Sequence, residues 1–179
     1  MVDEAGVRDS ALESAPRDVE PAGLVREFLP LERRRVRGNP PLDLVEIAHW
    51  EELRDLLEIA LGAVPPRPGE SRRRALRVRT HLKVLVTNSL AQELLHVHDL
   101  SDQGVFLRTQ RPLPAGSMLQ IELQERHGRA LELEGTVVWI REIAEGHGPC
   151  GMAVALHALS DRDRAVLAEL VESTLVVLD

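Results

Sequence analysis

Six short segments with alternating apolar and polar residues occupy the second part of the chain, and they restrict its fold more than any other feature. They are residues 81–88, 93–99, 104–109, 117–124, 130–142 and 150–159. Turn-forming clusters such as "RPLPAG" and "EGHGP" separate them, and no helical pattern lies between any two of them. Because strands at hairpin spacing without crossover helices pair antiparallel, the sequence predicts a mainly β fold, an antiparallel barrel or sandwich of six strands.

Helical patterns flank these strands. After the last strand, Ser160 has the position of an N-cap, with Asp163 three residues later. The apolar face of this C-terminal helix comprises Val166, Leu167, Leu170 and Val171. Before the strands, Asp43 and Glu46 have capping-box spacing, which predicts a helix over residues 43–61. Its expected apolar face comprises Leu44, Ile47, Leu53, Leu56, Leu57, Ala60 and Leu61, with Trp50 on the flank.

These patterns divide the chain into four parts. Residues 1–22 are rich in Ala, Glu, Asp, Ser and Pro without periodicity, which is typical of a disordered tail. Residues 23–64 form the N-terminal helical extension. A proline-rich run falls at residues 65–71, the expected linker, because it can carry neither a helix nor a central strand. The barrel domain with its C-terminal helix is expected over residues 72–179.

Composition disfavours several functions. Aromatic residues make up only 2% of the chain and the formal net charge is -7, whereas nucleic-acid binding needs stacking platforms or a broad basic face. The single cysteine allows neither an intramolecular disulfide nor a thiolate cage for zinc. The N-terminus lacks the pattern of a signal peptide, and no apolar run is long enough for a membrane span. We therefore expect a cytoplasmic protein that binds neither nucleic acid nor membranes.

Two short polar motifs frame the first two predicted strands. Arg73 and Arg77 form an RxxxR pattern in "RRALR", just before the first strand. Asp99, Ser101 and Gly104 form a DxSxxG pattern in "DLSDQG", just after the second. An arginine run alone is usually a solvated linker, and such a loop alone is often only a hairpin turn. Their order and their separation by one pair of strands together indicate an anion-binding site.

This arrangement resembles the PilZ domain, the bacterial cyclic di-GMP receptor module. The resemblance covers about residues 72–172 and includes the segments "RTQRPLPAGSMLQIEL", "GTVVWI" and "GMAVAL". It implies a six-stranded antiparallel PilZ-like β-barrel and a receptor for cyclic di-GMP, with no catalytic activity, metal or cofactor. The ligand-binding residues implied by the resemblance are Arg72, Arg73, Arg77, Asp99, Ser101 and Gly104.

The chemistry of these residues agrees with such a ligand. Arginine is permanently charged and can bind phosphate oxygens through two N–H groups, and its plane can stack on guanine. The Asp99 carboxylate can accept both N–H groups of the guanine Watson–Crick edge. Ser101 lies two residues along, on the same side of an extended chain. Gly104 would allow a close backbone approach or a positive φ at the turn.

Arg72 bears on the number of ligands. The resemblance associates an arginine at this position with two stacked nucleotides instead of one. Two ligands bring four phosphate charges, and Arg73 and Arg77 offset only two of them, so a further guanidinium at Arg72, helped by Arg74, favours the second ligand. The alternative is that Arg72 points into water and that one nucleotide binds.

Ligand binding is expected to order the arginine-bearing segment and to change the position of the N-terminal extension, which a partner protein would detect. The helix at residues 43–61 is a candidate surface for that partner. The alternative is a PilZ-like interaction adaptor of a pilus or motility complex that works without nucleotide. An enzyme would require a nucleophile with its base, or a metal.

Other candidate groups are weaker. Arg33 and Arg37 repeat the RxxxR pattern, but they precede a helix instead of a strand, so we assign them to a solvated face or an interaction surface. His96 and His98 have a spacing compatible with a metal, although further ligands are missing. No base is identifiable for Cys150. Trp139, in the strand "TVVWIRE", is expected to have a packing role.

Overall fold

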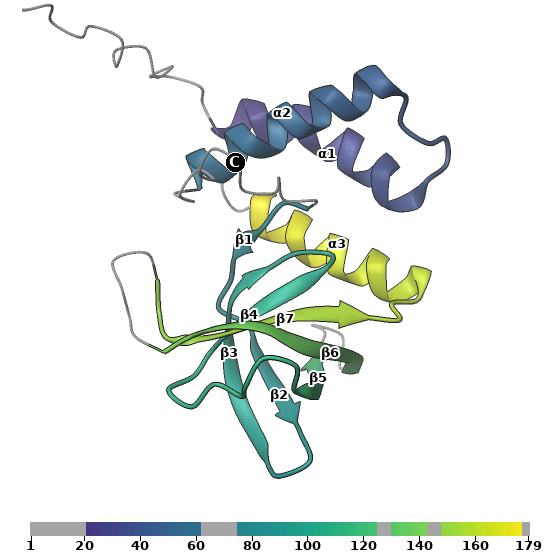
Figure 1. Cartoon of the computed structure of the whole chain (residues 1–179). Coiled ribbons are helices and arrows are strands. Elements are labelled where there is room, and N and C mark those ends of the chain that lie inside the picture. The colour runs from purple at the N-terminus through teal and green to yellow at the C-terminus, as the bar shows by residue number, and fades with distance from the viewer. Residues whose placement is uncertain (1–20, 62–74, 125–129, 143–147, 177–179) are drawn as a thin grey trace, which may run out of the picture.

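The computed structural model describes residues 21–61, 75–124, 130–142 and 148–176. Three helices and seven strands lie in these ranges (Figure 1). The helices are α1 (Pro21–Arg37), α2 (Leu44–Ala60) and α3 (Asp161–Val176). The strands are β1 (Val78–Arg79), β2 (Lys83–Thr87), β3 (Gln92–Leu100), β4 (Gly104–Arg108), β5 (Met118–Gln124), β6 (Ala130–Arg141) and β7 (Gly151–His157). The expected tail at residues 1–22 and the linker at residues 65–71 lie largely outside the described residues.

Six of the strands close into an antiparallel barrel. Their order is β3-β2-β5-β6-β7-β4, and the pairing of β4 with β3 completes the ring. The predicted six-stranded barrel is therefore confirmed. The short strand β1, which the sequence analysis did not separate from the arginine motif, pairs with β3 outside the ring and carries the chain from Arg77 onto the barrel wall.

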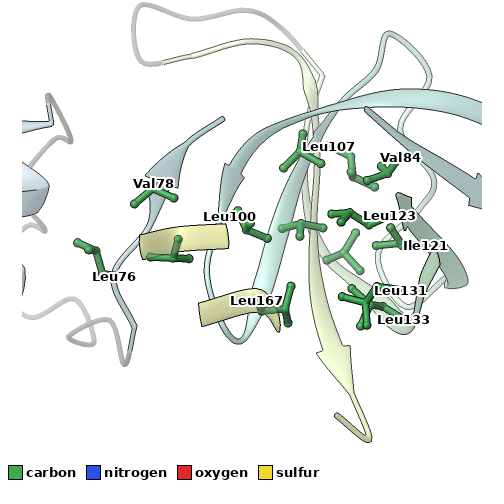
Figure 2. Close-up of a cluster of buried hydrophobic side chains, with 14 of the residues drawn as sticks. Leu76, Val78, Val84, Leu100, Leu107, Ile121, Leu123, Leu131, Leu133 and Leu167 are labelled. Atoms are coloured by element: carbon green, nitrogen blue, oxygen red, sulfur yellow. The ribbon is translucent and has the colours of Figure 1, made fainter. Parts of the chain in front are cut away.

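Alternation fills the barrel interior with apolar side chains (Figure 2). On β5, for example, Leu119, Ile121 and Leu123 are buried. Residues directly opposite each other in an antiparallel pair share a face, so Leu123 lies beside Leu131, and Ile121 lies beside Leu133, its partner in the register. The interior is thus a packed core.

Helix α3 covers the barrel and separates it from the N-terminal helices (Figure 1). Its inner side buries Leu167, Val171 and Leu175. The predicted N-cap is confirmed, since the amide of Asp163 donates to Ser160 Oγ at 3.2 Å and the amide of Ser160 donates to Asp163 Oδ2 at 2.9 Å. These reciprocal bonds satisfy N–H groups that the first turn cannot pair internally.

Helices α1 and α2 form an antiparallel hairpin whose α1 packs on α3. The predicted capping box of α2 is confirmed, with Asp43 as N-cap. The expected apolar face is partly wrong, because Leu44 is 84% exposed and Ile47 is also exposed. Trp50, placed on the flank from the sequence, is instead buried against Phe28, with ring centroids 6.0 Å apart. No helix among the described residues is long and apolar enough to cross a bilayer.

The second RxxxR pattern lies in the last turns of α1. Arg33 donates from Nε to Glu172 of α3 at 3.0 Å, and Arg34 donates to Glu46 of α2. Arg35, the next residue, is 22% exposed. Arg33 and Arg37 are both exposed, as the sequence analysis expected, but Arg33 also forms an ion pair with Glu172. The cluster holds the hairpin to the rest of the fold because Arg33, Arg34 and Arg35 each meet a carboxylate on a different element.

Candidate functional site

Two β-bulges at one end of the barrel turn polar and aromatic side chains outward. On β3 the pairing passes from Val97 to Asp99 while β4 advances one residue, so His98 is the extra residue. On β6 the pairing passes from Val137 to Trp139, so Val138 is extra. A bulge shifts all later side chains to the opposite face of the strand. Asp99 and Trp139 would otherwise point into the core.

The bulges create one row of side chains on the outer wall of the barrel. Asp99 pairs with Phe106, Phe106 with Ala153, and Ala153 with Trp139, across β3, β4, β7 and β6. Ala153 is the smallest member of the row, which leaves a hollow in front of it. This hollow is a pocket of about 220 Å³. Its lining comprises Ala75, Arg77, Asp99, Ser101, Gln103, Gly104, Val105, Phe106, Val138, Trp139, Ala153, Val154 and Ala155.

The structure brings four of the six predicted ligand residues to this pocket: Arg77, Asp99, Ser101 and Gly104 all line it. The other two, Arg72 and Arg73, lie outside the described residues. Arg77 is exposed and immediately precedes β1. Arg79, two residues later on β1, is the partner of Asp99 in the strand register. A cationic segment and a carboxylate therefore meet at the edge of the pocket.

Ser101 also has a structural role in the turn. It is 4% exposed, and its hydroxyl accepts from the amides of Gln103 at 3.3 Å and Gly104 at 3.2 Å. The amide of Ser101 donates in turn to the Gly104 carbonyl at 2.9 Å. These contacts close the turn between β3 and β4. Ser101 thus shapes the pocket wall by holding the turn.

Gly104 is required for close packing. It does not have the positive φ that the sequence analysis offered as one explanation, because positive values among the described glycines occur at Gly38, Gly116 and Gly148. A Cβ atom at Gly104 would lie 2.7 Å from the carbonyl oxygen of Val154 on β7. The glycine therefore allows β4 and β7 to approach where the barrel closes.

His98 lies beside the carboxylate of Asp99. Its Nδ1 atom lies 2.9 Å from Asp99 Oδ2. The imidazole ring also packs edge-on against Phe106, with centroids 6.0 Å apart. Both residues of this pair are partly exposed, so Asp99 keeps a face toward the pocket. Because the bulge separates His96 from His98, the suggested metal pair does not form a cluster, and no group of three or more His, Cys, Asp or Glu side chains in the described ranges could hold a metal ion.

An aromatic wall opposite Asp99 was missed by the sequence analysis. Trp139, expected only to pack, is 38% exposed and lines the pocket. Its ring lies 5.2 Å from that of Phe106, and the Arg141 guanidinium lies 5.2 Å from both ring centroids. These contacts fix the indole in place while part of it stays open. The signal for this wall was the run of large residues in "VVWIRE", but a single-residue bulge cannot be located from alternation alone.

The pocket can therefore bind a planar, anionic, hydrogen-bonding ligand. The exposed indole of Trp139 offers a stacking surface, the Asp99 carboxylate accepts N–H donors, and Arg77 supplies positive charge at the rim.

Known proteins resemble this chain in parts of its sequence and structure. A sequence profile of the PilZ domain matches residues 71–173, and no curated protein matches the chain. The structure is similar to the Bacillus subtilis inhibitor of motility, with 19% identity over 60% of this chain and 55% of that one, and a TM-score of 0.48. It is also similar to the PilZ domain of YcgR from Escherichia coli with c-di-GMP, with 20% identity, coverage of 58% and 92%, and a TM-score of 0.46.

A third similar structure is the K. pneumonia MrkH-c-di-GMP complex, with 16% identity, coverage of 60% and 54%, and a TM-score of 0.47. The chain thus spans about half the length of the Bacillus and Klebsiella proteins that it resembles. The profile match extends over more than half of the chain and includes both polar motifs and every barrel strand. The chain belongs to the PilZ domain family.

Proposed function

We propose that this protein is a cyclic di-GMP receptor without catalytic activity, acting in the cytoplasm. The observation that carries the proposal is the gathering of Arg77, Asp99, Ser101 and Gly104 at one pocket, with the exposed indole of Trp139 opposite the carboxylate. Membership of the PilZ family supports the choice of ligand. In this proposal Asp99 accepts the guanine N–H groups, and Arg73 and Arg77 bind the phosphates.

Calorimetric titration of the full chain with cyclic di-GMP tests the proposal. We expect Arg73→Ala, Arg77→Ala and Asp99→Asn each to lower the affinity by roughly 10- to 100-fold, since hydrogen bonds to charged groups are worth about 1.5–3 kcal/mol. Arg37→Ala is the matched control, because Arg37 ends the second RxxxR pattern on an exposed helix face. Wild-type protein that releases no heat, or an unchanged affinity in all three variants, would contradict the assignment.

We propose further that Arg72 favours a second nucleotide. Two ligands bring four phosphate charges to the site, which Arg73 and Arg77 alone do not neutralise. The expected stoichiometry is two nucleotides per chain in the wild type and one in Arg72→Leu. A wild-type stoichiometry of one would refute this part while leaving the receptor role intact. Parallel titrations with cyclic di-AMP and the mixed adenine-guanine ligand test the preference for guanine.

The proposed signal is an ordering of the arginine-bearing segment over the nucleotide, followed by a change at the N-terminal helices. We keep residues 65–71 as the proposed boundary between this extension and the barrel domain. Nucleotide-dependent exchange of amide hydrogens in α1 and α2 would measure the change. Identical exchange with and without bound nucleotide would exclude these helices as the output element.

A protein-interaction adaptor remains a second candidate, because the start of α2 exposes apolar side chains. Leu44 is 84% exposed and Val45 is 77% exposed. Adjacent exposed apolar residues are typical of a partner surface. A partner of a pilus or motility complex that binds without nucleotide, and is lost in Leu44→Asp with Val45→Asp, would favour this function. The same variant should leave the nucleotide titration unchanged.

A further inference from the structure

Asp102, inside the DxSxxG loop, is bound by a residue of the N-terminal helices. It lies between Ser101 and Gln103, which both line the pocket, and it is only 7% exposed. Its Oδ2 atom accepts a hydrogen bond from Arg35 Nη2 of α1 at 2.5 Å. Its Oδ1 atom has no hydrogen-bond partner among the described residues. Arg35 is therefore the cation that the structure shows beside this buried carboxylate.

Arg35 is itself held rigidly by the helical hairpin. Its Nε and Nη2 atoms donate to the two oxygens of Glu32 at 2.7 Å each. Glu32 also accepts from Trp50 Nε1 at 2.7 Å, and the Arg35 guanidinium lies 4.9 Å from the Trp50 ring centroid. Burial lowers the pKa of Arg35, but the hydrogen bonds and charges of Glu32 and Asp102 outweigh it, so the pKa lies above its usual value. Arg35 stays charged at every relevant pH.

From this network we propose that Arg35 is a positioning residue of the nucleotide site, and that its contact with Asp102 couples nucleotide binding to the docking of the α1–α2 hairpin. The inference rests on the proposed function. It has two physical parts, one electrostatic and one mechanical.

The electrostatic part concerns the negative charge of the DxSxxG segment. A nucleotide with two phosphates would bind next to a turn that already carries Asp99 and Asp102. Asp99 is used for guanine, but Asp102 lies behind the turn and would repel the ligand if it were not neutralised. A buried carboxylate that loses its partner must also rearrange to reach water. Removing Arg35 alone should therefore weaken cyclic di-GMP binding by roughly tenfold.

The mechanical part follows from reciprocity. If the docked hairpin improves nucleotide binding, bound nucleotide must stabilise the docked hairpin by the same factor. The contact between Arg35 and Asp102 links the hairpin directly to the pocket, because Arg35 belongs to α1 and Asp102 adjoins the turn residue Ser101. Nucleotide should thus slow amide hydrogen exchange in the second half of α1.

A matched control lies on the same helix. Arg33 also ties α1 to the rest of the fold, but its partner is Glu172 of α3, and it does not touch the loop. Arg33→Gln removes an ion pair of the hairpin while leaving Asp102 neutralised. Any effect that comes merely from a loosened hairpin should appear in both variants.

The experiment compares Arg35→Gln, Asp102→Asn, their combination and Arg33→Gln in the full chain, by calorimetry with cyclic di-GMP and by amide hydrogen exchange. We expect Arg35→Gln to bind about tenfold more weakly, and Arg33→Gln to bind as the wild type does. The combination should recover affinity to within about threefold, because no charge is left unpaired. It should nevertheless lose the nucleotide-dependent protection of α1.

If Arg35→Gln does not fold, Arg35→Lys replaces it, since lysine keeps the charge but cannot bind Glu32 and Asp102 with the same fork. Wild-type affinity in Arg35→Gln, retained nucleotide-dependent protection of α1 in Arg35→Lys, an equal loss in Arg33→Gln, or retained protection in the combination would each overturn the inference while the receptor role stands. Absence of binding in the wild type would overturn the proposed function and this inference together.

Discussion

Replacement of Gly104 by alanine tests how the barrel closes beside the pocket. The new Cβ would lie 2.7 Å from the Val154 carbonyl oxygen, closer than real Cβ contacts, and this oxygen belongs to the backbone, which cannot swing away. β4 and β7 must therefore separate by several tenths of an ångström, although they are paired directly in the barrel wall. Overpacking of this kind costs about 1–3 kcal/mol, and we expect Gly104→Ala to lower the free energy of unfolding by about 2 kcal/mol.

Urea unfolding followed by tryptophan fluorescence measures this change. Gly23→Ala is the control, because a Cβ there meets nothing within 4 Å and alanine favours a helix, so its stability should be unchanged or higher by up to about 1 kcal/mol. Gly104→Asn separates packing from backbone conformation. Asparagine tolerates a positive φ better than alanine but is larger. Wild-type stability in Gly104→Ala, or an asparagine variant more stable than the alanine variant, would refute the packing argument.

Ala153→Leu should fill the hollow between Phe106 and Trp139 and lower cyclic di-GMP affinity at least about tenfold while the circular dichroism spectrum is unchanged; an undiminished titration would place the ligand elsewhere. Asp163→Asn should lower stability at pH 7 by less than about 1 kcal/mol, because hydrogen bonds from Ser160 lower the pKa of this exposed carboxyl. A carboxyl whose pKa is lower in the folded state stabilises the folded protein at pH values above its unfolded pKa of about 3.9. The stability difference between the wild type and Asp163→Asn should therefore disappear as the pH falls below that value. A stability difference that persisted in urea unfolding at pH 2.5 would contradict this cause.

Regular alternation and helix capping made much of the fold predictable. Leu119, Ile121 and Leu123 are buried as their spacing requires, and both predicted helix caps form. The burial of Trp50 was not predicted because it depends on a residue that is distant in sequence. Trp50 is buried because Phe28 of α1 packs against it, and nothing in the local pattern of α2 indicates that neighbour.

The motif residues of the candidate site could be predicted from the sequence, but the aromatic wall and the contact with the N-terminal helices could not. Asp99 and Ser101 could be identified from their spacing and from the family resemblance. Trp139 could not, because a bulge at Val138 reverses the face of the strand without any change of residue type that marks it. Arg35 was hidden in a repeated arginine pattern, and only the folded chain shows that its partner is the motif loop.

The position of the pocket on the outer wall has a consequence for the kinetics of exchange. Because the interior is filled by side chains such as Leu107 and Ile121, a ligand of the pocket neither enters the barrel nor waits for its strands to separate. Its association and dissociation rates should then depend on the segment that precedes β1 and on solvent viscosity, and they should be insensitive to mutations that change only the unfolding rate of the barrel. A barrel made much more resistant to heat could thus still release its ligand as quickly as the natural protein.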